Sequence, residues 1–101
     1  MKLAWSALAL RDFEEATEYI AQDNPLAAQQ IAERILTATQ KLSDYPFIGH
    51  PGDDEDTREW LVRHTPYVLV YEIHGDTVYL SRVWHTRRDR RAIDTPDRPQ
   101  D

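Results

Sequence analysis

The fold of this chain is decided between residues 57 and 91, which read TREWLVRHTPYVLVYEIHGDTVYLSRVWHTRRDRR. Three segments of this stretch are rich in β-branched and aromatic residues, and turn residues separate them at 64–66 and around Gly75-Asp76. The pattern predicts three strands, at Arg58–Arg63, Tyr67–His74 and Thr77–His85. Because the connections are short, we expect an antiparallel meander.

The middle segment is apolar at every position from Tyr67 to Tyr71. A strand that is apolar on both faces is typical of the interior of a sheet, so we expect it to be central and covered by helices. The last segment does not alternate cleanly between apolar and polar residues, and this predicts a β-bulge near Arg82.

The N-terminal half has a helical period. Lys2–Ser6 is a short candidate strand, and a helix is predicted over Ala7–Gln22 with an apolar stripe at Leu10, Phe13, Thr17 and Ile20. Asn24 and Pro25 are well suited to cap and begin a second helix of about sixteen residues. Its predicted apolar stripe is Ala27, Ile31, Ile35, Ala38 and Leu42.

Residues 43–56 contain two prolines, two glycines and the acidic run 53–56, and they are predicted to form an exposed loop. The helical half would therefore be a hairpin joined to the strands by this loop. Residues 93–101 carry two prolines among polar and acidic residues, and we expect them to be a disordered tail.

Charge is unevenly distributed along the chain. Residues 57–91 hold seven arginines and four carboxylates, whereas residues 1–56 hold four basic and eleven acidic side chains. The chain has a formal net charge of −6 and two lysines, so any contact with nucleic acid would have to be local. The sequence has no cysteine and no apolar run near the ~18 residues of a membrane span, which predicts a cytoplasmic protein without membrane contact.

The order of one strand, two helices and a three-stranded meander resembles the RelE/ParE superfamily of bacterial type II toxins. Four segments between residues 2 and 91 carry the resemblance: 45–52 (YPFIGHPG), 57–59 (TRE), 67–71 (YVLVY), and 82–85 (RVWH) followed by 87–89 (RRD). The resemblance implies an α+β fold of order β-α-α-β-β-β, with an N-terminal helical hairpin on a small, mainly antiparallel sheet. It also implies one toxin domain over residues 1–92, and a cognate antitoxin that binds the toxin in a hetero-oligomer.

The superfamily contains two kinds of activity. Members similar to RelE cleave mRNA on the ribosome, which requires groups that stabilise the phosphate and transfer protons. By resemblance, His85, Arg58 and Arg87 are the candidate catalytic residues, with Arg58 and Arg87 on the phosphate and His85 as the proton-transfer group. His50 and Arg63 are possible additional members of the site.

Members similar to ParE poison DNA gyrase and need contact residues rather than catalytic groups. The candidates for target or antitoxin contact are Arg82, Trp84, Arg87, Arg88, Arg90, Arg91 and Trp60. The scarcity of lysine argues against a ribosome-dependent nuclease, and the segments TRE and YVLVY resemble the ParE branch more closely. We therefore favour gyrase inhibition over mRNA cleavage, with a weakly toxic or non-toxic interaction module of the same fold as a third reading.

Structural roles are an alternative for several of these residues. His85 at the end of a strand is more often a hydrogen-bonded structural histidine than a catalyst, and Arg58 could pair with Glu72 across the sheet. His50, between a glycine and a proline, could hold its loop. The histidine spacings and the acidic run match no zinc or calcium motif, so no metal and no cofactor are expected.

Overall fold

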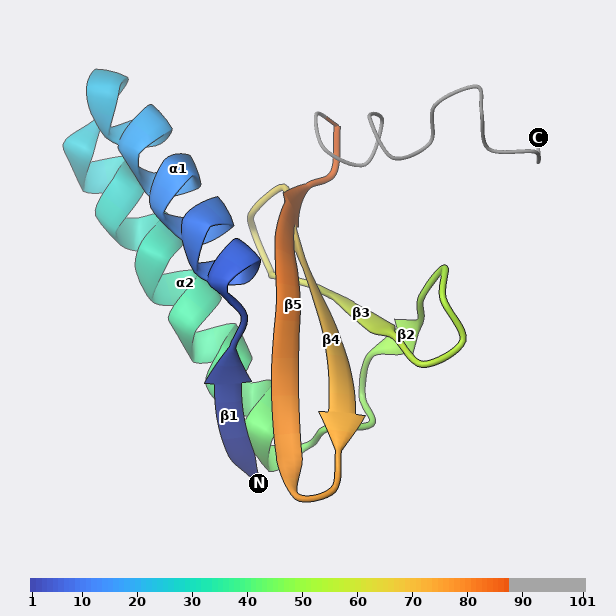
Figure 1. Cartoon of the computed structure of the whole chain (residues 1–101). Helices are drawn as coiled ribbons and strands as arrows, with labels where there is room; N and C mark the ends of the chain where they lie inside the picture. The colour runs from blue at the N-terminus through green and yellow to red at the C-terminus, as the bar shows by residue number, and fades with distance from the viewer. Residues whose placement is uncertain (88–101) are drawn as a thin grey trace, which may run out of the picture.

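The computed structural model describes residues 1–87, and these form two helices and a five-stranded sheet (Figure 1). The elements in chain order are β1 (Lys2–Trp5), α1 (Ala7–Asp23), α2 (Pro25–Asp44), β2 (His50–Pro51), β3 (Arg58–Leu61), β4 (Tyr67–His74) and β5 (Thr77–His85). The predicted α+β class and the N-terminal helical hairpin are confirmed. The predicted tail at 93–101, together with Arg88, Arg90 and Arg91, lies outside the described residues.

The strand order in the sheet is β1-β5-β4-β3-β2, so β4 is central as predicted. All neighbouring strands are antiparallel except β1, which runs parallel to β5 and pairs Trp5 with Leu80. The helical hairpin lies beside β1 and β5, while β2 and β3 extend away from it (Figure 1). The helices therefore leave the β3 side of the sheet less covered.

The predicted β-bulge is confirmed. Val70 pairs with Arg82, but the next residue of β4, Tyr71, pairs with Leu80, so Ser81 is the extra residue of β5. Because side chains alternate between faces, the extra residue puts Leu80 and Val83 on the same face of the sheet. Both are buried in the core beneath the helices, and Arg82 lies on the opposite face with Val70.

The apolar stripe predicted for the first helix is wrong at Leu10, whose side chain is 47% exposed. The buried positions of α1 are Ala9 and Ala16, and Phe13 and Ile20 pack beside them against the core. The buried stripe therefore begins one residue earlier than predicted, at the small residue Ala9. The large apolar side chain of Leu10 suggested burial, but the size of a side chain does not decide which positions of α1 are buried.

The second helix begins at Pro25 as expected, and Asn24 caps it by accepting a hydrogen bond from the Ala27 N–H at 3.0 Å. Ile35, Ala38 and Leu42 are buried, as the pattern predicts. The helix continues to Asp44, so the predicted start of the loop at residue 43 is too early. Its last turn is held by the N-terminus, because the Met1 ammonium donates to the Ser43 carbonyl at 3.1 Å.

The prediction of an exposed loop over residues 43–56 is also wrong in its middle. His50 and Pro51 form β2, paired with Glu59 and Arg58, and Gly49 is buried. The cause is the Tyr71 hydroxyl, which accepts from the Gly49 N–H at 3.0 Å and donates to the Pro46 carbonyl at 2.7 Å. A buried side chain 22 residues away thus holds the loop against the sheet. The strand predicted at 58–63 ends at Leu61.

Candidate partner-binding surfaces

The end of β5 carries several of the residues predicted for target contact. The His85 ring packs edge-on against Tyr67 with 5.4 Å between ring centroids, and its Nδ1 accepts the Arg87 backbone N–H at 3.1 Å. A neutral imidazole whose Nδ1 accepts a hydrogen bond carries its proton on Nε2. His85 therefore shapes the turn that follows β5 and directs the exposed Arg87 into it.

Arg82 and Trp84 lie together on the face of β5 opposite the core. The Arg82 guanidinium lies 5.3 Å from the centroid of the Trp84 ring and forms a salt bridge with Asp12 of α1. Its Nε is 2.8 Å from Oδ2 and its Nη2 is 3.0 Å from Oδ1 of this carboxylate. Arg82 is thus tied to the helical hairpin rather than projecting freely from the sheet.

Arg58 holds the loop before β2. Its Nη1 donates to the carbonyls of Gly49 at 3.0 Å and Phe47 at 3.3 Å, and its guanidinium lies 5.0 Å from the centroid of the Phe47 ring. Arg58 also lines a pocket of about 290 Å³ whose other walls include three carboxylates, those of Glu55, Asp56 and Glu72. Carboxylates at this density repel a phosphate from the Arg58 side of the sheet.

The proposed catalytic residues are not gathered in one place. Arg58 pairs with Tyr71, whereas His85 pairs with Tyr67, four residues away on β4. At ~3.3 Å per residue and ~4.8 Å per strand, this register separates Arg58 from His85 by roughly 13 Å along the strands and roughly 10 Å across them. His85 and Arg87 lie together at one end of the sheet, and Arg58 and the exposed His50 lie on the opposite side.

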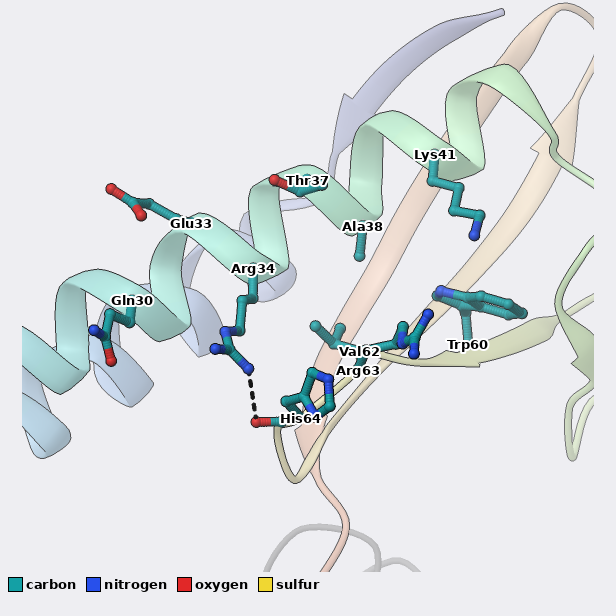
Figure 2. A pocket seen from close by; sticks show the side chains of 10 residues that line it. All are labelled: Gln30, Glu33, Arg34, Thr37, Ala38, Lys41, Trp60, Val62, Arg63 and His64. Atoms are coloured by element: carbon teal, nitrogen blue, oxygen red, sulfur yellow. Dashed lines mark hydrogen bonds between the residues drawn. The ribbon is translucent and has the colours of Figure 1, made fainter.

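A groove of about 470 Å³ runs between α2 and β3 (Figure 2). Trp60 and Val62 come from the sheet side and Ala38 from the helix, and the remaining lining residues are Gln30, Glu33, Arg34, Thr37, Lys41, Arg63 and His64. Val62 is 2% exposed and Ala38 is 8% exposed, so the floor of the groove is continuous with the core. Trp60 is half-buried and packs against this core.

The rim of this groove is cationic. Figure 2 shows Arg34 and Lys41 reaching from α2 towards β3, where the Lys41 ammonium lies 5.6 Å from the centroid of the Trp60 ring. Arg34 is linked to the His64 carbonyl by a long hydrogen bond of 3.5 Å. Arg63 adds a third positive charge, and within residues 1–87 Glu33 is the single carboxylate that lines the groove.

The sequence predicts Trp60 and Arg63 of this groove as candidate site residues, but not Arg34 and Lys41. A signal existed, because Gln30, Arg34, Ala38 and Lys41 recur at helical spacings of four, four and three and share one face of α2. Only the fold shows that this face borders β3. The sequence also gave no sign of the salt bridge between Asp12 and Arg82, whose partners are 70 residues apart.

The surroundings of Tyr71 clearly perturb the pKa of its hydroxyl. Burial raises the pKa of the Tyr71 hydroxyl, and this outweighs the Gly49 N–H and the nearby Arg58, both of which lower the pKa. No three His, Asp or Glu side chains within residues 1–87 come together as metal ligands. Neither helix in that part of the chain is long and apolar enough to cross a membrane. The perturbed tyrosine has a structural role, since both its hydrogen bonds hold the loop before β2.

Two solved structures resemble this fold. One is described as the chromosomal ParDE TA system from P. aeruginosa, with a TM-score of 0.78 and 17% identity over 86% of this chain and 97% of that one. The other is described as the YoeB/ParE toxin from Agrobacterium tumefaciens, with a TM-score of 0.59 and 18% identity over 84% of this chain and 98% of that one. At these identities the likeness establishes the fold.

Two curated toxins share more sequence identity with this chain than the two solved structures do. The chain is 38% identical to putative toxin Y4kP of Sinorhizobium fredii over 80 residues, which cover 79% of this chain and 83% of the relative. It is 36% identical to toxin RelE2 of Caulobacter vibrioides over 87 residues, covering 86% of this chain and 97% of the relative. The sequence model for the ParE toxin of the type II toxin-antitoxin system parDE matches residues 3–90. The chain therefore belongs to the ParE toxin family of type II toxin-antitoxin systems, within the RelE/ParE superfamily.

Proposed function

We propose that this toxin inhibits growth by poisoning DNA gyrase in the cytoplasm, and that a cognate antitoxin neutralises it in a hetero-oligomeric complex. The observation that supports gyrase as the target is the separation of Arg58 from His85 and Arg87. Phosphoryl transfer requires its charge-stabilising and proton-transfer groups within a few ångströms of one phosphate. A poison that acts by contact has no such requirement.

Charge supports the same conclusion. Arg58 shares its pocket with three carboxylates, and the guanidinium already donates to two backbone carbonyls. The two lysines and the acidic N-terminal half give a poor surface for mRNA, whose binding depends on how many phosphates are neutralised. The end of β5, with Trp84, His85 and Arg87, is then a contact surface for the target.

A second candidate function is mRNA cleavage on the ribosome. It is favoured by the similarity to the Caulobacter toxin named RelE2 over 97% of that protein. In this case His85 and Arg87, which lie together after β5, would act on the phosphate and its leaving group. Arg58 would then have a structural role, because it donates hydrogen bonds to two carbonyls of the loop before β2.

The experiment that separates the two is the rate of amino-acid incorporation in the first minutes after the toxin is induced without an antitoxin. Gyrase poisoning predicts continued translation while growth fails later, and gyrase-mediated DNA cleavage by the purified toxin in vitro. Prompt arrest of translation would contradict the proposal and favour cleavage of mRNA. Unimpaired growth would leave an interaction module of the same fold.

The variant His85→Ala sharpens this test. Loss of a proton-transfer group typically lowers a rate by about 10²- to 10⁴-fold, so a nuclease would become harmless in cells. Under gyrase poisoning the variant should keep much of its toxicity, because the ring packs against Tyr67 and accepts the Arg87 backbone N–H, and neither contact is a proton transfer. The matched control is His74→Ala, since His74 is exposed and bonds to Glu72 at the opposite end of β4.

A further inference from the structure

Two cationic side chains cross the groove between α2 and β3. Arg34 donates to the His64 carbonyl at 3.5 Å, and the Lys41 ammonium lies 5.6 Å from the centroid of the Trp60 ring (Figure 2). Arg34 and Lys41 are seven positions apart, which is roughly 10 Å along the helix. A compact occupant fits between these two contacts, whereas a longer one would have to break at least one of them.

The floor of the groove between these contacts is apolar. Val62 and Ala38 are buried and Trp60 is half-buried, so the indole ring is the largest apolar group of the floor that still meets water. Covering this ring would remove further apolar surface from water. The groove has a volume of about 470 Å³, within the ~300–1,000 Å³ that is typical of small-molecule sites.

The charges around this floor favour an anion. Arg34 and Lys41 line the groove from α2 and Arg63 lines it from the sheet side, against the one carboxylate of Glu33 among the described residues. Within residues 1–87 no salt bridge involves any of these three cations. An anionic group on the occupant would therefore gain partners that the chain itself does not supply.

The turn on the sheet side of the groove has a strained backbone. His64 has a φ of 61°, and within residues 1–87 it is the one residue other than glycine with a positive φ. Side chains rarely adopt this left-handed conformation, and residues held in it are often found beside ligand sites. The carbonyl of His64 accepts the hydrogen bond from Arg34, so the turn and α2 are linked across the groove before any ligand binds.

We propose that this groove is a binding site for a small organic anion with a flat apolar body of about two fused rings and one carboxylate or sulfonate group. The rings would cover Trp60 and Val62, and the anionic group would pair with Arg34 and Arg63. The proposal goes beyond the proposed function, because it depends on the groove and not on the target that the toxin attacks.

The chain's own C-terminal segment fits this chemistry poorly. Residues 88–101 contain four arginines and four aspartates, and they contain no aromatic residue. A segment with no net negative charge and no ring would neither satisfy the cations of the groove nor cover the indole of Trp60.

The test titrates 2-naphthoate into the purified, ¹⁵N-labelled full-length chain and follows the indole N–H signals of its three tryptophans by NMR. The signal of Trp60, assigned by its loss in Trp60→Phe, should shift saturably, while those of Trp5 and Trp84 stay in place. Neutral 2-naphthamide, which has the same shape, should bind at least ~10-fold more weakly, and the cation 2-naphthylmethylammonium more weakly still. Added salt should reduce the preference for the anion, because exposed charges are screened.

Variants of the cations assign the site. Arg63→Glu, at an exposed side chain, should weaken binding of 2-naphthoate by at least ~10-fold and should make the naphthyl cation the better ligand. Arg34→Glu should act in the same direction, but it also removes the bond to the His64 carbonyl, so its thermal unfolding is measured alongside. Arg11→Glu, on the exposed surface of α1, is the matched control and should leave binding unchanged.

Each of the remaining outcomes overturns the proposal. Equal affinity for 2-naphthoate and 2-naphthamide would remove the role of charge, and no saturable shift of the Trp60 signal up to ~10 mM would remove the site. An equal loss of binding in Arg11→Glu and Arg63→Glu would show attraction by net charge alone.

Other occupants of the groove would also be detected. Affinity for 2-naphthoate that rises in Ile93→Asp would assign the groove to the chain's own C-terminal segment. A dimer in sedimentation that Arg63→Glu dissociates would assign it to a second copy. Because no readout involves gyrase or translation, failure of the proposed target leaves this test intact.

Discussion

The carboxylate of Asp12 on α1 accepts two hydrogen bonds from the Arg82 guanidinium of β5, at 2.8 and 3.0 Å. The same carboxylate accepts the backbone N–H of Val83 at 2.9 Å. The reason is topological, because β1 ends at Trp5, opposite Leu80, and leaves the rest of β5 as an edge. Where the chain turns into α1, a side chain of the helix takes over a hydrogen bond that β1 would have made.

Replacing Asp12 by alanine should therefore lower the free energy of unfolding by about 2–3 kcal/mol, since it leaves the half-buried guanidinium and one backbone N–H without their acceptor. Asp12→Asn retains an acceptor for Val83 and should cost about half as much. Urea denaturation followed by far-UV circular dichroism measures both. Glu14→Ala, an exposed carboxylate on the same helix, is the control, and an equal loss there would contradict the specific role of Asp12.

Ser6→Ala should cost more than Asn24→Ala, although each residue caps a helix. The Ser6 hydroxyl accepts from the Ala9 N–H at 2.9 Å and also donates to the Ser81 carbonyl at 2.8 Å, inside the bulge of β5. Within residues 1–87 the Asn24 side chain makes the capping bond alone. Loss of a cap costs about 1 kcal/mol, and the second hydrogen bond of Ser6 should add about 1 kcal/mol. Equal midpoints of thermal unfolding for the two variants would show that the bond to Ser81 contributes nothing.

Tyr71 should make the fold sensitive to alkali. Burial raises the pKa of its hydroxyl above the ordinary value of 10.0, so above about pH 10 the unfolded chain loses this proton while the folded chain retains it. The contribution is fully present below pH 10 and is lost as the pH rises towards the folded-state pKa. Tyr71→Phe should remove this loss, as measured by the urea midpoint between pH 8 and pH 11.

The same variant should cost about 1–3 kcal/mol at neutral pH, because the buried Gly49 N–H loses its acceptor. Tyr45→Phe, at a side chain that is 62% exposed, is the matched control. If both variants lost the same stability, the hydroxyl of Tyr71 would not be what holds the loop before β2.

Gly49 and Gly75 should respond differently to alanine. A Cβ at position 49 would lie 2.5 Å from the Tyr71 hydroxyl oxygen and 3.0 Å from the Glu59 carbonyl oxygen, whereas a Cβ at position 75 meets nothing within 4 Å. Gly75→Ala carries only the strain of a φ of +61°, about 1 kcal/mol. Gly49→Ala should cost about 2–3 kcal/mol through steric overlap.

Adding Tyr71→Phe to Gly49→Ala tests the cause of that loss. The pair should destabilise by less than the sum of the single changes, because removal of the hydroxyl relieves the closest overlap. Strictly additive free energies of unfolding would place the clash elsewhere, against Glu59 or the Tyr71 ring.

Much of this fold follows from local pattern. The apolar run from Tyr67 to Tyr71 predicted the central strand, and the broken alternation near Arg82 predicted the bulge. Asn24 and Pro25 predicted where α2 begins. Each of these signals is carried by residues close together in the chain, so that steric and hydrogen-bonding preferences of a short segment are enough to generate them.

Local pattern failed where a distant residue decides the environment. Leu10 has the period of a core residue, yet it is exposed, and Ala9 and Ala16 of the same helix are buried instead. The loop before β2 has the composition of an exposed turn, yet Gly49 is buried and donates a hydrogen bond to the Tyr71 hydroxyl. Local pattern was equally silent on where the candidate catalytic residues lie, since only the register of β3, β4 and β5 decides that Arg58 lies far from His85.

The sequence by itself determined the order of the helices and of every strand except β2, the central strand and membership of the toxin family, because these depend on hydrophobic period and on motifs that are contiguous in the chain. The tertiary structure alone decided which charges meet. It joined Asp12 to Arg82 across 70 residues and set Arg34 and Lys41 of α2 opposite Trp60 of β3. A hydrogen bond requires its two atoms within ~3.5 Å, and salt screens exposed charges beyond ~10 Å, so these pairs form only once the sheet and the helical hairpin have packed.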